Sequence, residues 1–573
     1  MKYLLAFCLF ANSAWAMNLY NLNVDFTDNV ATVQPVLGVN RGVVEHRNGQ
    51  FYDYSTLYQL MGITSVRNFG EAHFDVCHIY SAATLTLVGV PGAPTDCRSQ
   101  QTTADGQIYL DWSEENSADT ENRRHFPLTQ GQNWKNLARQ KLRKLGIEPY
   151  EFLGESIHGP NYVSTPENWG RVASQYVLHL SRLARPSFVE IWQAPDDIAW
   201  TGPNVGVSSD LEFGDFYRQA VEQLAGVSAI DDIPRGGSGF STQGVVDFIH
   251  QVAATPSGIG SFMGNVLTQA GEANFDFIST QFDAQLATPL TGCESGPAPS
   301  CLAHYLEKLR WALDRHYGVI GLIPPPLHIT QWRSGHNCSA TSHYSEGGKN
   351  CNGLKTSNAV AQMLTLLLQP ELNIERAFLA NGLWHNELFG NANNEDSPEK
   401  FRLSPEAVGL YAFQGLENRL LPNTTMEKTN FPETEQVSVV EAAKRNWPLT
   451  GFAASDYPWA PPGTDYRSVV AINNSDQAGF VLLTLKGFND DFLYDYTETR
   501  FEPQPDLGSF FEATGSGTEN DPFVAHKNQL LDTWGKTIRV NVGQTQIFND
   551  GVILMLVHMT PRGIYRIDYR RSK

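Results

Sequence analysis

Two short stretches of the chain combine β-branched residues, a tryptophan and side-chain amides. Residues 189–196 read Val-Glu-Ile-Trp-Gln-Ala-Pro-Asp, and residues 327–333 read Leu-His-Ile-Thr-Gln-Trp-Arg. An aromatic face packs well against the C–H face of a sugar ring. A glutamine amide both donates and accepts hydrogen bonds, so it can bind hydroxyl groups without carrying charge. Each tryptophan taken alone is typical of core packing, but three tryptophans that each follow a predicted strand, Trp192, Trp332 and Trp384, favour a cleft that binds a polyhydroxylated ligand.

Short apolar runs that end in polar residues are typical of buried parallel strands, which deliver side chains to one end of an α/β barrel. The expected strands span residues 35–41, 63–69, 146–154, 189–196, 235–240, 275–281, 327–333 and 376–379. The expected helices span residues 52–61, 133–145, 165–184, 210–225, 244–254, 302–317 and 358–368. Eight strand–helix units in order predict an α/β fold with a (β/α)8 TIM barrel. A doubly wound sheet is the alternative, but it gives no reason for a run of eight.

The pattern changes at about Trp447, after which short strands are separated by turn residues. Four of these strands span residues 468–473, 480–485, 537–542 and 552–557. They predict an all-β sandwich appended to the barrel. We therefore expect a barrel over residues 17–446 and a sandwich over residues 447–573, with the strand near residues 18–34 as a candidate member of the sandwich.

Composition limits the possible partners and location of the protein. The formal net charge is −20 over 573 residues, which argues against nucleic acid as a partner. Residues 1–16 form a short basic start, an apolar run and an Ala-Trp-Ala site, which is typical of a bacterial signal peptide and predicts a secreted or periplasmic protein. No further apolar run is long enough to span a bilayer. The sequence does not determine the oligomeric state.

Cysteine spacing predicts disulfides. Removal of the signal peptide takes away Cys8 and leaves six cysteines, an even number that favours disulfides in an exported chain. Local pairing is the simplest arrangement, and it gives Cys77–Cys97, Cys293–Cys301 and Cys338–Cys351. No Cys-x-x-Cys spacing accompanies them, so we expect no metal site and no cofactor.

The two opening stretches, together with Leu37-Gly38-Val39-Asn40 and Gly146-Ile147-Glu148-Pro149, resemble glycoside hydrolase family 39, the β-xylosidase and exopolysaccharide-hydrolase relatives. That resemblance implies a catalytic Glu on strand four, in a Glu-x-Trp-Asn-Glu-Pro-Asp pattern, and another on strand seven, in Ile-Thr-Glu-Trp. This chain has Ala194 at the first position and Gln331 at the second. Retaining hydrolysis needs two carboxyl groups across the scissile bond. The resemblance therefore implies a sugar-binding pseudoenzyme.

Other residues complete the expected site. The candidate sugar contacts are Arg67, Trp192, Gln193, Gln281, Gln331, Trp332 and Trp384. Arg67 has an equally strong alternative role as a buried tie between strands. If hydrolysis remains, Glu155 and Asp196 are the fallback carboxylates, in an inverting or substrate-assisted mechanism; otherwise Asp196 caps a turn. A third hypothesis is a structural scaffold whose cleft is filled by its own loops.

Overall fold

The structure is a computed structural model of the whole chain. It describes most of residues 19–68, 134–153, 184–196, 209–294, 297–333, 353–380, 405–430, 433–456, 465–501, 538–545 and 551–572. Short pieces within residues 79–110, 170–181 and 389–403 are also described. The expected signal peptide lies outside the described residues. Two compact units are present: residues 33–418 with 505–534, and residues 1–32 with 419–504 and 535–573.

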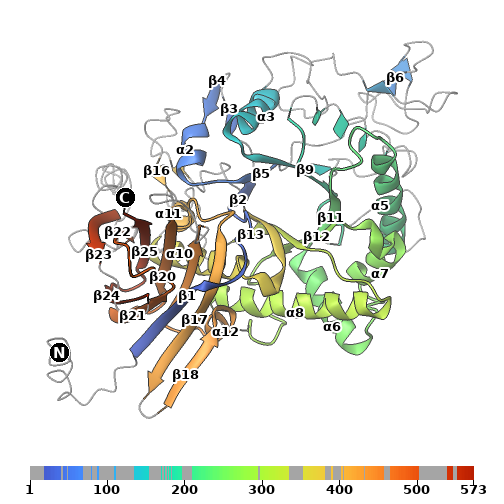
Figure 1. Cartoon of the computed structure of the whole chain (residues 1–573). Helices are drawn as coiled ribbons and strands as arrows, with labels where there is room; N and C mark the ends of the chain where they lie inside the picture. Colours follow the sequence, from blue (N-terminus) through green and yellow to red (C-terminus); the bar gives the residue numbers. More distant parts are fainter. Residues whose placement is uncertain are drawn as a thin grey trace, which may run out of the picture. The chain divides into compact units, whose positions relative to one another are not determined.

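The larger unit contains a closed barrel of eight strands, each parallel to its neighbours, in the order β10-β11-β12-β13-β14-β2-β5-β9 (Figure 1). Its strands are β2 (Gly38–Asn40), β5 (Ser65–Asn68), β9 (Glu148–Leu153), β10 (Phe188–Ile191), β11 (Arg235–Phe240), β12 (Phe277–Phe282), β13 (Leu327–Trp332) and β14 (Ile374–Leu379). The predicted (β/α)8 barrel is confirmed.

Helices follow the strands along the barrel unit (Figure 1). They are α2 (Ser55–Leu60), α3 (Trp134–Leu145), α5 (Ser209–Ala225), α6 (Thr242–Ala254), α7 (Phe262–Ala270), α8 (Ala298–Val319), α10 (Gly353–Leu367) and α11 (Pro405–Tyr411), with the short 3-10 turns η2 (Glu272–Asn274) and η4 (Pro370–Leu372). The expected helix over residues 165–184 lies mostly outside the described residues. Helix α7 was not predicted from the sequence.

Small β elements interrupt the barrel unit. They are the hairpin β3 (Val44–Arg47) and β4 (Gln50–Asp53), the three-stranded sheet of β6 (Ile79–Tyr80), β7 (Leu87–Val88) and β8 (Tyr109–Leu110), and the pair β15 (Phe389–Gly390) and β16 (Arg402–Leu403).

The second unit is a curled, mixed ten-stranded sheet. Its strands are β1 (Leu19–Thr32), β17 (Leu420–Asn430), β18 (Glu433–Ser438), β19 (Leu449–Ser455), β20 (Tyr466–Asn473), β21 (Gly479–Lys486), β22 (Tyr494–Phe501), β23 (Ile538–Thr545), β24 (Val552–Met559) and β25 (Ile564–Arg571), with helix α12 (Val439–Lys444). Strands β1 and β21 are parallel, whereas the other pairs in this sheet are antiparallel. The strands expected to form a two-layer sandwich thus belong to one continuous sheet that curls around a single apolar core.

The β unit begins earlier in the chain than Trp447. Strand β17 pairs antiparallel with β1 over most of its length, from Leu19 opposite Thr429 to Thr32 opposite Leu420. Because this ladder joins the N-terminal strand to residues after Arg419, β17, β18 and α12 belong to the sheet and not to the barrel. The strand near residues 18–34 is therefore a full member of the sheet.

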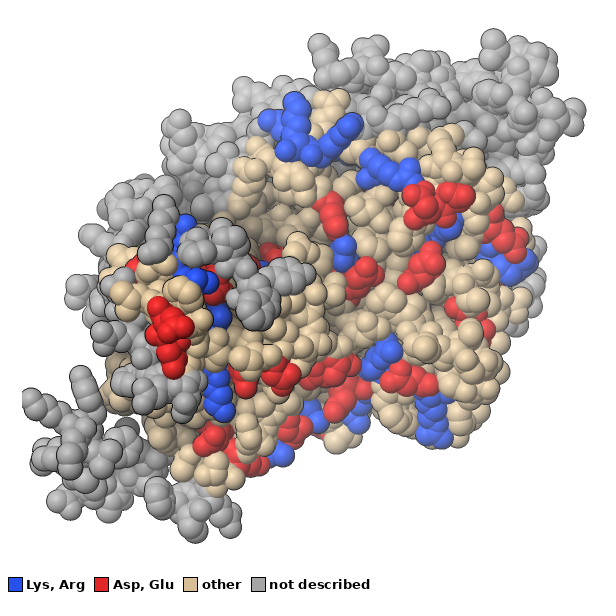
Figure 2. Space-filling view, in the orientation of Figure 1, with Lys and Arg blue, Asp and Glu red and all other residues tan. Residues whose placement is uncertain are grey.

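Charged side chains of both signs are mixed on the surface of the protein. Acidic and basic side chains are interspersed over the face shown in Figure 2, despite the net charge of −20.

Cys293 and Cys301 form the predicted disulfide at the start of α8. The other two expected pairs, Cys77–Cys97 and Cys338–Cys351, lie outside the described residues. Within the described part of the chain, no helix is long and apolar enough to cross a membrane.

Aromatic side chains and a histidine pack together inside the barrel. Tyr150, Phe188, Phe277 and Phe378 form a buried cluster, and the ring of His328 stacks on Phe277 with centroids 3.9 Å apart. The Nδ1 atom of His328 lies 3.2 Å from the Tyr150 hydroxyl, and Nε2 lies 3.1 Å from a Glu375 carboxylate oxygen. Burial lowers the pKa of His328 to about 4, although Glu375 opposes this shift.

The lowered pKa of His328 predicts a stability that falls with acidification. Between about pH 6.5 and pH 4 the unfolded chain binds a proton at this histidine and the folded chain does not, so the free energy of unfolding decreases as the pH falls. The full effect is about 3 kcal/mol. Urea unfolding should show the advantage of the wild type over His328→Gln shrinking across this interval. The exposed His250→Gln is the control, and a constant difference for His328→Gln would contradict the prediction.

Candidate functional site

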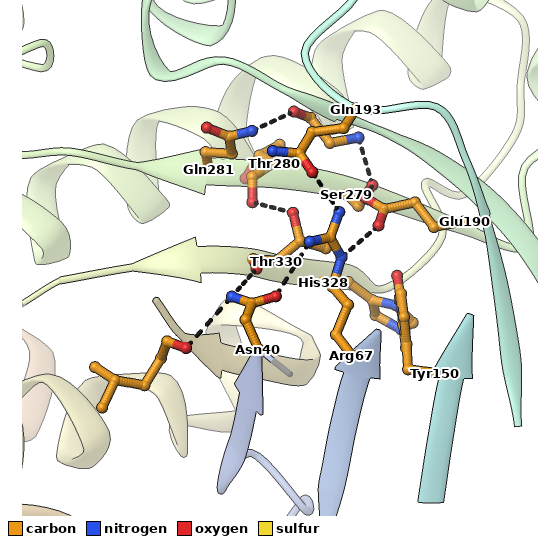
Figure 3. A network of polar contacts seen from close by, with 12 residues as sticks. Asn40, Arg67, Tyr150, Glu190, Gln193, Ser279, Thr280, Gln281, His328 and Thr330 are labelled. Atoms are coloured by element: carbon orange, nitrogen blue, oxygen red, sulfur yellow. Dashed lines mark hydrogen bonds and ion pairs between the residues drawn. The ribbon is translucent and has the colours of Figure 1, made fainter. Parts of the chain in front are cut away.

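Arg67 is the centre of a polar network at the ends of the barrel strands (Figure 3). Its guanidinium is fully buried. Nε donates to Oε2 of Glu190 at 2.6 Å, Nη1 to Oδ1 of Asn40 at 3.1 Å, and Nη2 to Oε1 of Gln193 at 3.1 Å. The planar fork of an arginine suits three fixed acceptors better than a flexible ammonium group does. Arg67 thus joins β2, β5 and the end of β10, and of its two predicted roles the structure shows the buried tie.

Glu190 is a buried carboxylate whose two oxygens both accept hydrogen bonds. One accepts from Arg67, and the other accepts from the hydroxyl of Ser279 at 2.6 Å. The backbone N–H of Gly239 donates in turn to the Ser279 hydroxyl at 2.6 Å. Complete burial raises the pKa of Glu190, while Arg67 and Ser279 oppose that rise. Glu190 therefore holds strand ends together and is not exposed to a ligand.

Asn40 extends the network to the other side of the barrel. Its Nδ2 donates to the backbone carbonyl of Thr330 at 3.0 Å and to that of Leu379 at 3.3 Å. The Thr330 hydroxyl donates to the carbonyl of Thr280 at 3.3 Å. These partners lie on β13, β14 and β12, and Gly239, which donates to Ser279, lies on β11. Together with β2, β5 and β10, the polar chain therefore links seven of the eight strands (Figure 3).

The chain leaves β10 through an unusual turn. Trp192 and Ala194 both have positive φ, 69° and 44°, a region that non-glycine residues seldom occupy. The N–H of Ala194 donates to the carbonyls of Ser238 and Gly239, which holds the turn against β11. The Ala194 side chain is buried. The residue at the position implied for the acid/base Glu is therefore a packed methyl group.

The turn places the ring of Trp192 against a helix. The ring is 6% exposed and meets Phe216 of α5 edge-on, with centroids 5.6 Å apart. Trp332, at the end of β13, is 0% exposed, and its Nε1 has no hydrogen-bond partner among the described residues. In this structure neither ring offers a free face to a sugar. Trp384 lies outside the described residues.

Asp196 is bound to the start of helix α6. Its carboxylate accepts from the backbone N–H of Ser241 at 3.0 Å and from the Ser241 hydroxyl at 2.8 Å. Ser241 is the N-cap of α6, and its hydroxyl accepts from the N–H of Gly244. Carboxylates at helix N-termini are favoured by the helix dipole. Asp196 thus contacts a helix start that lies 45 residues further along the chain, whereas the expected alternative role was to cap the turn directly after its own strand. Glu155, the other fallback carboxylate, lies outside the described residues.

Two glutamines at adjacent strand ends remain partly exposed. Gln281 of β12 and Gln331 of β13 are partners in the parallel register, and each is half-buried. Nε2 of Gln281 donates to the Gly239 carbonyl at 3.3 Å. Gln193, in contrast, is buried against Arg67. Among the predicted contacts that the structure describes, only this neighbouring pair, Gln281 and Gln331, presents partly exposed side chains.

The sequence interpretation did not identify several residues that build the site. Asn40 and Ser241 form side-chain hydrogen bonds to two of the predicted candidates, Arg67 and Asp196. Ser279 binds Glu190, the ion-pair partner of Arg67. Asn40 ends an otherwise apolar strand, and Ser279 begins a run of three polar residues within β12. A polar side chain in a strand that is expected to be buried needs a hydrogen-bond partner, and this is the signal that could have found both residues. Ser241 follows β11 directly and precedes a helix, which is a typical N-cap position. No cluster of metal-ligating side chains occurs among the described residues.

Known proteins resemble this chain in structure, at low sequence identity. No protein-family model matches the chain, and no curated protein matches it in sequence. Solved structures match over nearly the whole length. A GH39 enzyme from Xanthomonas axonopodis pv. citri is 12% identical with a TM-score of 0.54, and covers 98% of this chain and 99% of its own.

Two further solved structures are similar to the same extent. An α-L-arabinofuranosidase from Thermotoga maritima, solved as an arabinose complex, is 12% identical with a TM-score of 0.55 and coverages of 96% and 99%. A glucosidase from Croceicoccus marinus is 10% identical with a TM-score of 0.53 and coverages of 97% and 100%. The chain has a glycoside hydrolase fold. At these identities the likeness concerns the fold alone.

The Arg67–Glu190 pair predicts a strong energetic coupling. Arg67→Met leaves the Glu190 carboxylate buried without its counter-ion, and Glu190→Gln leaves Arg67 without its own, so each should cost about 3–5 kcal/mol of unfolding free energy. The double variant should cost clearly less than the sum of the two. Urea unfolding measures all three.

The exposed ion pair of Arg185 with Asp232 provides the control. Arg185→Met should cost no more than about 1 kcal/mol, because solvent screens an exposed pair. Additive losses at Arg67 and Glu190 would show that the two side chains do not depend on each other.

Proposed function

We propose that the protein is a carbohydrate-binding barrel that does not carry out retaining glycoside hydrolysis. One observation carries this proposal: in a barrel of glycoside hydrolase fold, the strand ends that resemble the two catalytic positions carry Ala194 and Gln331. A methyl group has no proton to donate, and an amide is a poor nucleophile and no base at neutral pH. General acid–base catalysis alone contributes roughly 10²–10⁴-fold, and the covalent route would be lost with it.

The carboxylates beside these positions have other partners. Both oxygens of Glu190 accept hydrogen bonds, one of them from the guanidinium of Arg67. Asp196 accepts from Ser241 at the start of α6. Using either group as a catalytic acid would remove a contact that the fold uses. This argues against a relocated mechanism through Asp196, whereas Glu155 remains an alternative that only an experiment tests.

The strand ends still offer a polar surface suited to a neutral sugar. In TIM barrels the ligand site lies at the C-terminal ends of the strands, and Gln281 and Gln331 lie side by side there. Amide groups can bind vicinal hydroxyls by donating to one and accepting from another. Solved structures of similar fold include an arabinofuranosidase, a β-xylosidase and a glucosidase. Neutral pentosides and hexosides are therefore the first ligands to test.

We also propose that the protein is exported to an oxidising compartment. The signal-like residues 1–16 and the Cys293–Cys301 disulfide both suit a secreted or periplasmic protein. Extracellular polysaccharide is then a ligand that the protein would encounter.

Binding without turnover is the expected result. Isothermal titration with arabino-, xylo- and gluco-oligosaccharides should detect binding, and mass spectrometry of the same mixtures should detect no hydrolysis product. Gln331→Ala should weaken binding about threefold to tenfold, because it removes one hydrogen-bonding side chain. Gln436→Ala, at an exposed glutamine of the β unit, is the control.

Two outcomes would contradict the proposal. Hydrolysis that is abolished by Glu155→Gln or Asp196→Asn would show an active enzyme with relocated carboxylates. Failure to bind any glycan would favour a structural scaffold.

A further inference from the structure

Strand β24 forms one end of the large sheet, and none of the described strands pairs with its outer edge. The strand order ends β1-β21-β24. Strand β24 pairs with β21 over eight consecutive residues without a bulge, from Val552 opposite Lys486 to Met559 opposite Gly479. Its outer backbone groups thus form a regular row of donors and acceptors.

The sequence of β24 has none of the features that usually protect an edge. It reads Val-Ile-Leu-Met-Leu-Val-His-Met, with no proline, glycine, lysine, arginine or carboxylate. Soluble proteins normally protect a free edge with charge, proline, a bulge or a covering segment. The strand at the opposite end of the sheet, β23, reads Ile-Arg-Val-Asn-Val-Gly-Gln-Thr and does contain such residues. Of the strands at the two ends of this sheet, only β24 lacks such residues in its own sequence.

The face of the sheet beside this edge is apolar and exposed. Leu554 and Leu556 are 54% and 58% exposed, and Phe480 of β21 is 46% exposed. Leu556 lies opposite Leu482, and Phe480 lies opposite His558, with their rings 5.1 Å apart. Single exposed leucines are ordinary in soluble proteins, but neighbouring ones beside an unpaired edge mark an interaction surface.

The outer face of the same sheet is polar near its other end. There β22 and β25 pair with their half-exposed and exposed positions occupied by charged and hydroxyl side chains. These residues are Asp495, Thr497, Thr499, Arg566, Asp568 and Arg570. An apolar face is thus not a general property of this sheet, and the surface at Phe480, Leu482, Leu554 and Leu556 requires its own explanation.

We propose that β24 is a dimerisation edge, at which it pairs antiparallel with β24 of a second copy of this chain. Two copies of one strand run antiparallel when a two-fold axis perpendicular to the sheet relates them, and the contact is then isologous. With the axis through Met555, Leu554 of one copy lies opposite Leu556 of the other, and both lie on the apolar face. No charged side chain on either strand would oppose the approach. The pairing joins the two sheets into one and buries the surface beside Phe480.

Sedimentation velocity of the full chain across the micromolar range tests the proposal. The wild type should be a dimer that dissociates on dilution, and Leu556→Lys should be a monomer at every concentration. Leu556 is mostly exposed, so its replacement leaves the fold intact, as circular dichroism can verify. Ile323→Lys removes the most exposed large apolar side chain, at 88%, from the barrel unit. This control should remain dimeric.

Hydrogen exchange of β24 then identifies the contact. In the proposed dimer, the backbone amides of β24 that point away from β21 exchange slowly at high protein concentration and quickly after dilution. A wild-type monomer in which these amides are slow at all concentrations would show that another part of the chain covers the edge, and would overturn the proposal. A dimer in which they always exchange quickly would also overturn it, because the copies would then meet elsewhere.

Discussion

The buried ion pair of Arg67 with Glu190 is the interaction on which the arrangement of the barrel mouth depends. Taking both charges out of water costs several kcal/mol each, and their attraction compensates only when the geometry is good and the remaining atoms are hydrogen-bonded. Asn40 and Gln193 accept the other hydrogen bonds of the Arg67 guanidinium, and the Ser279 hydroxyl donates to the second oxygen of the Glu190 carboxylate. Each of these partners lies on or directly after a barrel strand. The need to satisfy one pair of charges thus fixes the relative positions of β2, β5, β10 and β12.

Fixing these strand ends also determines which side chains can meet a ligand. Gln193 is held inward by Arg67, and the tight turn that follows packs Trp192 against α5 and buries Ala194. Beyond β11, on the strands β12 and β13, Gln281 and Gln331 remain partly exposed. Among the predicted contacts that the structure describes, the partly exposed groups are therefore side-chain amides. A protein can keep the framework of an enzyme fold while the groups at its strand ends support binding alone, because fold and chemistry are separable.

The sequence predicted the features that depend on local pattern. Alternation of short apolar strands with helices predicted the barrel, and close spacing predicted the Cys293–Cys301 disulfide. It did not locate the start of the β unit, because the pairing of β1 with β17 joins residues about 400 positions apart and leaves no local signal. Trp192 shows another limit: its positive φ breaks the two-residue alternation of a strand, so its direction could not be inferred from its position in the run. The two possible roles of Arg67 could be separated only by seeing that its partners are buried with it.

We propose that the barrel mouth binds a sugar but lacks the carboxylate that would attack it. Gln331→Glu is a nearly isosteric change that supplies this group at the position the resemblance implies. A dinitrophenyl glycoside of a sugar that the wild type binds needs no acid to expel its leaving group, so a carboxylate at position 331 could form a covalent glycosyl ester. Gln281→Glu, at the neighbouring amide, is the matched control. Intact-protein mass spectrometry should detect one glycosyl adduct on Q331E and none on the wild type or Q281E. A folded, sugar-binding Q331E that forms no adduct would show that position 331 is not placed to attack the bound sugar.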